Sequence, residues 1–124
     1  MALILNLLYL TPEEERAFSH AAPESRQVFL PGDVTAPLRY PDATVILGNP
    51  DPETLVATRS LKWLHTWSAG MDRYQKPGVL PAGAALTSSS GAYGQSVSEH
   101  LFAMLLALEK RIPAYRDGQK AGVW

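Results

Sequence analysis

Short apolar runs, each of a length typical of a β-strand, recur along the first two thirds of the chain. Residues 2–9 form a nearly continuous apolar run that only Asn6 interrupts. Such a run is typical of a strand buried on both faces of a parallel sheet. Further strands are predicted at residues 27–30, 43–47, 61–67 and 84–87.

Helix signals lie between these predicted strands. Thr11 is followed by proline and, three residues after it, by Glu14, which predicts a capped helix that ends before Pro23. A second, short helix is predicted from the Asp-Pro-Glu sequence at residue 51 to about Thr58. Residues 31–33, with a proline and a glycine, are a predicted turn.

The last third of the chain has helical periodicity. Residues 95–112 are predicted to form one long helix, and Ser96 with Glu99 has the spacing of a capping box at its start. Pro113 interrupts this pattern, so residues 114–120 are predicted to be a separate short helix. Apolar residues occupy positions 97, 101, 104, 105, 108 and 112, and others widen the stripe.

Strands that alternate with helices predict an α/β fold. For this length we expect a flavodoxin-like three-layer sandwich, in which a five-stranded parallel sheet of order 2-1-3-4-5 carries helices on both faces. Residues 1–112 would form the domain, and residues 113–124 a C-terminal helix or interdomain linker. Ligands of such sheets bind beyond the carboxyl ends of the strands, near the switch point between strands 1 and 3.

The composition narrows the function classes. Hydrophobic residues make up 46% and charged residues 19% of 124 residues, with a net charge of -1, so no basic surplus indicates a nucleic-acid partner. The chain has no cysteine, which excludes disulfides and thiolate metal sites. No apolar run approaches the roughly 20 residues of a membrane span. The apolar start lacks the basic segment of an export signal, so we expect a cytoplasmic protein.

The small-residue sequence that runs from Ser68 to Asp72 is the strongest local candidate for a binding site. Small residues allow a ligand to approach the backbone, and consecutive amides can converge on an anion such as a carboxylate. A plain turn, with Gly70 present for its backbone angles, explains the same residues. Gly91 and Gly94 fit neither a Walker loop nor G-x-G-x-x-G.

The three histidines give weaker signals. His20 is predicted to end the first helix, His65 to lie paired or partly exposed in a strand, and His100 to lie one turn into the long helix. No two histidines and a carboxylate have the spacing of metal ligands, and no serine lies in a G-x-S-x-G sequence.

Four segments together resemble the substrate-binding domain of the D-isomer-specific 2-hydroxyacid dehydrogenases, and most of all the glyoxylate and hydroxypyruvate reductase branch. The most specific segment is the last, in which residues 96–100, residues 111–116 and the terminal Trp124 resemble the link between the two lobes of that family. The four segments are residues 44–48, 61–72, 86–94 and 95–124.

The resemblance implies a role for several residues. The loop would bind the carboxylate of a 2-oxo acid or 2-hydroxy acid through its backbone amides, residues after the third strand would line the same cleft, and His100 would face the cofactor side. The implied substrate-binding residues are Gly48, Asn49, Ser68, Ala69, Gly70 and Met71.

The resemblance also implies what this chain lacks. In the family, the catalytic arginine, glutamate and histidine and the dinucleotide loop follow the point that matches Trp124, and no G-x-G-x-x-G occurs here. We therefore expect a chain truncated before its NAD(P)-binding domain, which binds no cofactor and is inactive alone. The intact parent would use NAD or NADP.

Two further expectations concern partners and alternatives. The exposed apolar residues of the helix at 95–112 would support a homodimer through the C-terminal helices, which could be exchanged between chains. The alternative function is a stand-alone flavodoxin-like binding, signalling or purely structural module. Residues 9–12 lack the phosphate loop of a flavodoxin and the acidic residues of a phospho-receiver.

Overall fold

The computed structural model describes residues 1–30, 32 and 36–123, which form two compact units. Unit 1 is Met1–Ser90 and unit 2 is Gly91–Trp124, and each is considered separately below. Parts of the predicted turn at residues 31–33, and Trp124, lie outside the described residues.

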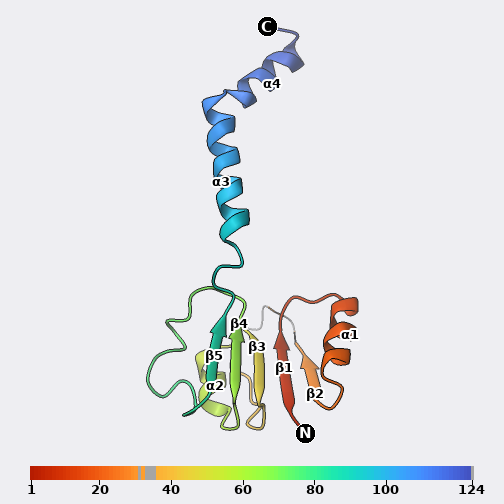
Figure 1. The fold of residues 1–124 in the computed structure, drawn as a ribbon, viewed down its shortest axis with the longest axis vertical. Coiled ribbons are helices and arrows are strands. Elements are labelled where there is room, and N and C mark those ends of the chain that lie inside the picture. The colour runs from red at the N-terminus through yellow and green to blue at the C-terminus, as the bar shows by residue number, and fades with distance from the viewer. Residues whose placement is uncertain (31, 33–35, 124) are drawn as a thin grey trace. The chain divides into compact units, whose positions relative to one another are not determined.

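Unit 1 is built on a parallel sheet. Its five strands lie in the order β2-β1-β3-β4-β5, and Figure 1 shows all the arrows pointing the same way. This arrangement confirms the predicted sheet and its order. The strands are β1 (Leu3–Leu7), β2 (Arg26–Phe29), β3 (Val45–Gly48), β4 (Trp63–Thr66) and β5 (Ala85–Ser88).

Helix α1 (Pro12–Ala21) begins at a capping box, as predicted. The Thr11 hydroxyl oxygen accepts from the Glu14 amide at 3.3 Å, and the Thr11 amide donates to the Glu14 carboxylate at 2.7 Å. These contacts satisfy backbone donors that the first turn of a helix leaves without intrahelical partners. The local sequence therefore determines where α1 begins.

Helix α2 (Pro52–Ala57) begins at Asp51, whose side chain accepts from the Glu53 amide at 2.8 Å. From β1 the chain continues through α1 to β2, on one side of β1 in the sheet, whereas from β3 it continues through α2 to β4, in the opposite direction across the sheet. Because such crossovers are right-handed, α1 and α2 lie on opposite faces of the sheet. Hydrogen bonding agrees on the α1 side, where the Gln27 side chain of β2 donates to the Phe18 carbonyl at 2.7 Å.

The core of unit 1 lies on the α2 side of the sheet. Leu5, Ile46 and Leu64 occupy matching positions of neighbouring strands and are fully buried, and Leu55 of α2 belongs to the same cluster. Removing apolar surface from water is the main favourable term in folding, so this row holds the sheet against α2. The remaining buried members of the cluster are Leu7, Ala43, Leu61 and Tyr74.

Unit 2 consists of α3 (Gly94–Glu109) and α4 (Ile112–Ala121). The predicted capping box is wrong, because α3 begins at Gly94 and both members of the box lie inside the helix. There the Glu99 carboxylate accepts from the Gln95 side chain one turn earlier, at 2.8 Å, which is a favourable spacing on a helix.

The break between the two helices falls slightly earlier than predicted. Arg111 has a φ of 54°, in the left-handed region, and Pro113 lies in the first turn of α4. Proline has no amide hydrogen, so Pro113 cannot donate to the carbonyl of Glu109, and α3 ends there instead of at Ile112.

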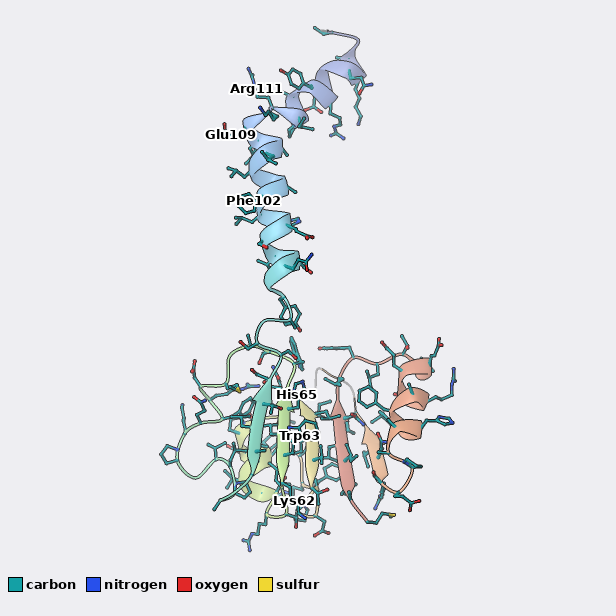
Figure 2. All side chains as sticks on the ribbon, in the orientation of Figure 1. Lys62, Trp63, His65, Phe102, Glu109 and Arg111 are labelled. Atoms are coloured by element: carbon teal, nitrogen blue, oxygen red, sulfur yellow. The ribbon has the colours of Figure 1, made fainter. Side chains whose placement is uncertain are left out.

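No side chain of α3 is buried. Phe102, labelled in Figure 2, is 60% exposed, which is high for so large an apolar side chain. Among the residues that the structure describes, no helix combines the length and apolar character that crossing a membrane requires. The large exposed apolar residues of α3 are Val97, Leu101, Phe102, Met104, Leu105, Leu106 and Leu108.

The capping box gives a stability prediction. Thr11→Ala should lower the free energy of unfolding of unit 1 by about 1 kcal/mol, because the Glu14 amide loses its acceptor. Urea denaturation followed by tryptophan fluorescence measures this, since Trp63 and Trp67 lie in unit 1. Ser19→Ala, which removes an exposed hydroxyl from the last turn of α1, away from the cap, is the matched control and should change little.

The difference in the free energy of unfolding between the wild-type chain and Thr11→Ala should depend on pH. Hydrogen bonds from the Thr11 amide and hydroxyl hold the pKa of the Glu14 carboxyl below its usual value, the amide having the larger effect. Thr11→Ala keeps the amide and removes only the contribution of the hydroxyl. A lowered pKa in the folded chain means that this part of the stabilisation is present near neutral pH and is lost as the pH falls through that pKa. A Thr11→Ala effect that grows on acidification would contradict this assignment.

Candidate functional site

Two loops predicted to bind substrate follow neighbouring strands of the sheet. Gly48 ends β3, and Ser68 comes shortly after β4; these strands pair directly, with Leu47 opposite His65. The carboxyl ends of parallel strands meet at the same edge. Both loops therefore belong to the carboxyl edge of the sheet, where the ligands of this fold bind.

The loop after β4 has an uneven distribution of hydrogen bonds. Three of its carbonyls accept hydrogen bonds: Ser68 O from the Thr66 hydroxyl at 3.0 Å, Gly70 O from the Ser68 hydroxyl at 3.1 Å, and Met71 O from the Tyr74 amide at 2.8 Å. Within the part of the chain that the structure describes, no acceptor is bound by the amides of residues 69–71. More of the carbonyls than of the amides in this loop are therefore hydrogen-bonded within the chain.

Gly48 brings the other loop close to β1. Its φ is +120°, and a Cβ atom there would lie 2.7 Å from the carbonyl oxygen of Leu7. L-residues rarely adopt this backbone conformation, so both the angle and the close approach require glycine. The next residue, Asn49, has a buried side-chain oxygen without a hydrogen-bond partner among the described residues.

Arg73 and Tyr74, which the sequence did not single out as site residues, connect the two loops. The Tyr74 hydroxyl donates to the carbonyl of Pro50 at 2.9 Å, and the Arg73 guanidinium donates to the carbonyl of Asn49 at 3.4 Å and to the Tyr74 hydroxyl. No motif marks these residues in the sequence. Their only signal is that they directly follow the small-residue loop.

A hydrogen-bonded row crosses β4 and β5 on the sheet face opposite the core. Thr87 contacts both the Trp63 indole nitrogen at 2.8 Å and His65 Nδ1 at 2.9 Å, and Ser89 Oγ lies 3.5 Å from His65 Nε2. Figure 2 labels Trp63 and His65 on β4. His65 is therefore partly exposed and paired, as predicted, and its contacts are those of a structural residue.

The other candidates lie elsewhere. His100 is an exposed residue of α3 in unit 2 and is described only within that unit. A surface hollow in unit 1 lies beside the ends of β1 and β2, and none of its lining residues belongs to the loops at 48–50 or 68–71. It is lined by Leu8, Tyr9, Leu10, Glu15, Phe29, Leu30 and Gly32.

Comparison with known proteins supports the fold. No model of a known protein family matches the sequence. Among solved structures, the chain is similar to a D-isomer specific 2-hydroxyacid dehydrogenase family protein from Aeromonas salmonicida subsp. salmonicida, with 24% sequence identity and a TM-score of 0.71. The match covers 99% of this chain and 40% of that protein, so the chain spans well under half of the neighbour's length.

The conformation of Gly48 gives a second prediction. Gly48→Ala should destabilise unit 1 by about 3 kcal/mol, since the new methyl group would meet the Leu7 backbone in a conformation unfavourable for alanine. Gly78→Ala is the control, because Gly78 also has a positive φ but no atom lies within 4 Å of the place that its new methyl group would occupy. Equal losses in urea denaturation would show that the contact with Leu7 is unimportant.

Proposed function

We propose that this chain is the substrate-binding lobe of an NAD(P)-dependent D-2-hydroxyacid dehydrogenase of the glyoxylate and hydroxypyruvate reductase type. The observation that carries the proposal is the loop after β4, in which the carbonyls of Ser68, Gly70 and Met71 accept hydrogen bonds while the amides of residues 69–71 have no acceptor among the described residues. The sequence resemblance and the similar solved structure support the same family.

In this proposal the chain contributes binding and orientation. Backbone donors would hold the carboxylate of a 2-oxo acid or 2-hydroxy acid, as consecutive amides hold other anions. Gly48 and Asn49 would form the neighbouring wall, on the strand that pairs with β4. The amide donors would come from Ser68, Ala69, Gly70 and Met71.

The residues of this chain do not fit a nicotinamide dinucleotide. No G-x-G-x-x-G occurs, and Gly91, which has a φ of +87°, is followed by glycine again only at Gly94. We assign the dinucleotide, the catalytic groups and the hydride transfer to a further domain of the intact cytoplasmic parent. By the family resemblance, His100 would face that further domain. The chain by itself should be inactive as a dehydrogenase.

The proposal predicts weak binding of a 2-oxo acid. Titration of glyoxylate into the isotopically labelled chain should shift the amide signals of Ala69, Gly70 and Met71 most, with an affinity in the millimolar range because the catalytic arginine that would add a charge-assisted contact is assigned to the further domain. Assays with glyoxylate and either nicotinamide cofactor should show no turnover above the background of a mock preparation.

Three outcomes separate the proposal from its alternatives. Shifts confined to other loops would contradict the assigned site, and a chain that binds neither glyoxylate nor hydroxypyruvate would favour an inert structural module. Turnover that stays with the purified chain through successive columns would contradict a lobe without catalytic groups.

We also propose a homodimer formed through α3 and α4, with residues 113–124 as an interdomain segment. Large apolar side chains of α3 are exposed, and contiguous apolar surface beyond a few hundred Å² usually indicates a partner. Analytical ultracentrifugation at micromolar concentration should find a dimer, and paired Leu101→Glu and Leu105→Glu substitutions should convert it to a monomer. A wild-type chain that remains monomeric on concentration would exclude this interface.

A further inference from the structure

Tyr74 is a buried residue whose hydroxyl joins two segments distant in the sequence. Its side chain is 1% exposed and belongs to the core cluster of unit 1. The hydroxyl donates to the carbonyl of Pro50 at 2.9 Å, across 24 positions of sequence. Its own amide donates to Met71 O at 2.8 Å. One residue thus contacts both loops of the proposed cleft.

Arg73 supports this contact from the solvent side. Its guanidinium donates to the Tyr74 hydroxyl and to the carbonyl of Asn49, and its central carbon lies 4.7 Å from the centre of the Tyr74 ring. The contact over the ring is a favourable cation–π geometry. Arg73 therefore holds the hydroxyl oriented toward Pro50 while it also contacts the loop after β3.

The side chain of Asn49 does not replace these contacts. Its buried oxygen has no hydrogen-bond partner among the described residues, so Asn49 itself adds little to hold its loop in place. Burial raises the pKa of the Tyr74 phenol above its usual value, although the Arg73 guanidinium acts in the opposite direction. A phenol is protonated near neutral pH even at its ordinary pKa, so the hydroxyl is able to donate there.

We infer that Tyr74 is a positioning residue for the substrate. Its hydroxyl sets the spacing between the loop at 48–50 and the amides at 69–71, so that a 2-oxo acid contacts both loops at once. This inference rests on the proposed function. Tyr74 acts through the two loops, and its hydroxyl, engaged by Pro50 and Arg73, is not itself a catalytic group.

The first test needs no ligand. Hydrogen–deuterium exchange is compared among the wild-type chain, Tyr74→Phe and Tyr40→Phe, in peptides that span residues 48–54 and 68–75. The protected amides of these peptides include those of Thr54 and Tyr74, which donate to the carbonyls of Asp51 and Met71. Tyr74→Phe keeps the buried ring but removes the donor, so exchange in both peptides should rise about fivefold. Tyr40 is half-buried against the same core but lies outside both loops, so its variant should leave these peptides unchanged.

The second test uses two ligands of similar size. Pyruvate carries a carboxylate and an adjacent oxo group, whereas propionate carries the carboxylate alone. If Tyr74 positions the loops for both groups, Tyr74→Phe should lower the ratio of pyruvate to propionate affinity about fivefold. A merely structural role would weaken both ligands equally. Arg73→Gln, a change at an exposed residue, should lower the affinity ratio as well. This variant replaces Tyr74→Phe in the test if Tyr74→Phe does not fold.

Each outcome decides the inference. Faster exchange in both peptides with a lower affinity ratio supports it. Unchanged exchange in Tyr74→Phe overturns the contact between the loops, and faster exchange with an unchanged ratio overturns the positioning role. A wild-type chain that binds neither acid overturns the proposed function and the substrate role of Tyr74, and the exchange comparison then decides the loop contact alone.

Discussion

The packing of one row of aliphatic side chains across the middle of the sheet underlies the rest of unit 1. Leu5, Ile46 and Leu64 lie opposite one another on adjacent strands and have no exposed surface. A slip of one residue in any strand would turn its apolar side chains to the other face, so this row specifies the register of β1, β3 and β4. The register in turn aligns the ends of β3 and β4, from which both loops of the candidate site begin.

The candidate site is defined by backbone groups more than by charged side chains. Hydroxyl and amide donors within the segment 66–74 bind the carbonyls of Ser68, Gly70 and Met71, whereas the amides of residues 69–71 have no acceptor among the described residues. Buried or partly buried peptide groups need hydrogen-bond partners. The unpaired amides are the basis of the proposed carboxylate site, and Tyr74 connects this loop to the one that follows β3.

The two units differ in how they use apolar residues. In unit 1, aliphatic side chains are buried between the sheet and α2, whereas α3 has apolar residues on most of its surface and buries none of them. A helix that is apolar on most sides is typical of the interior of a larger assembly. This contrast supports the proposal that α3 and α4 contact another copy of the chain.

Local patterns in the sequence were sufficient to predict the capping box of α1 and the position of the small-residue loop, because capping chemistry and short-range periodicity specify them. The strand order was predicted from the alternation of strands and helices and the length of the chain, for which this order is the usual one. The same reasoning misplaced the start of α3, where Ser96 and Glu99 have a capping spacing but lie within the helix. A side chain caps a helix only when its own residue directly precedes the first helical residue and has a non-helical conformation. Residue type alone does not guarantee that conformation.

The contacts of Tyr74, Arg73 and Gly48 could be found only in the tertiary structure. Tyr74 reaches Pro50 across 24 positions of sequence, and Gly48 is required by the backbone of Leu7 on another strand. Composition and periodicity describe neighbours along the chain, whereas these contacts arise when β1, β3 and β4 pair in register. The sequence by itself therefore determined which elements form and where the small-residue loop lies, and the packing of the sheet decided which residues hold that loop against its neighbour.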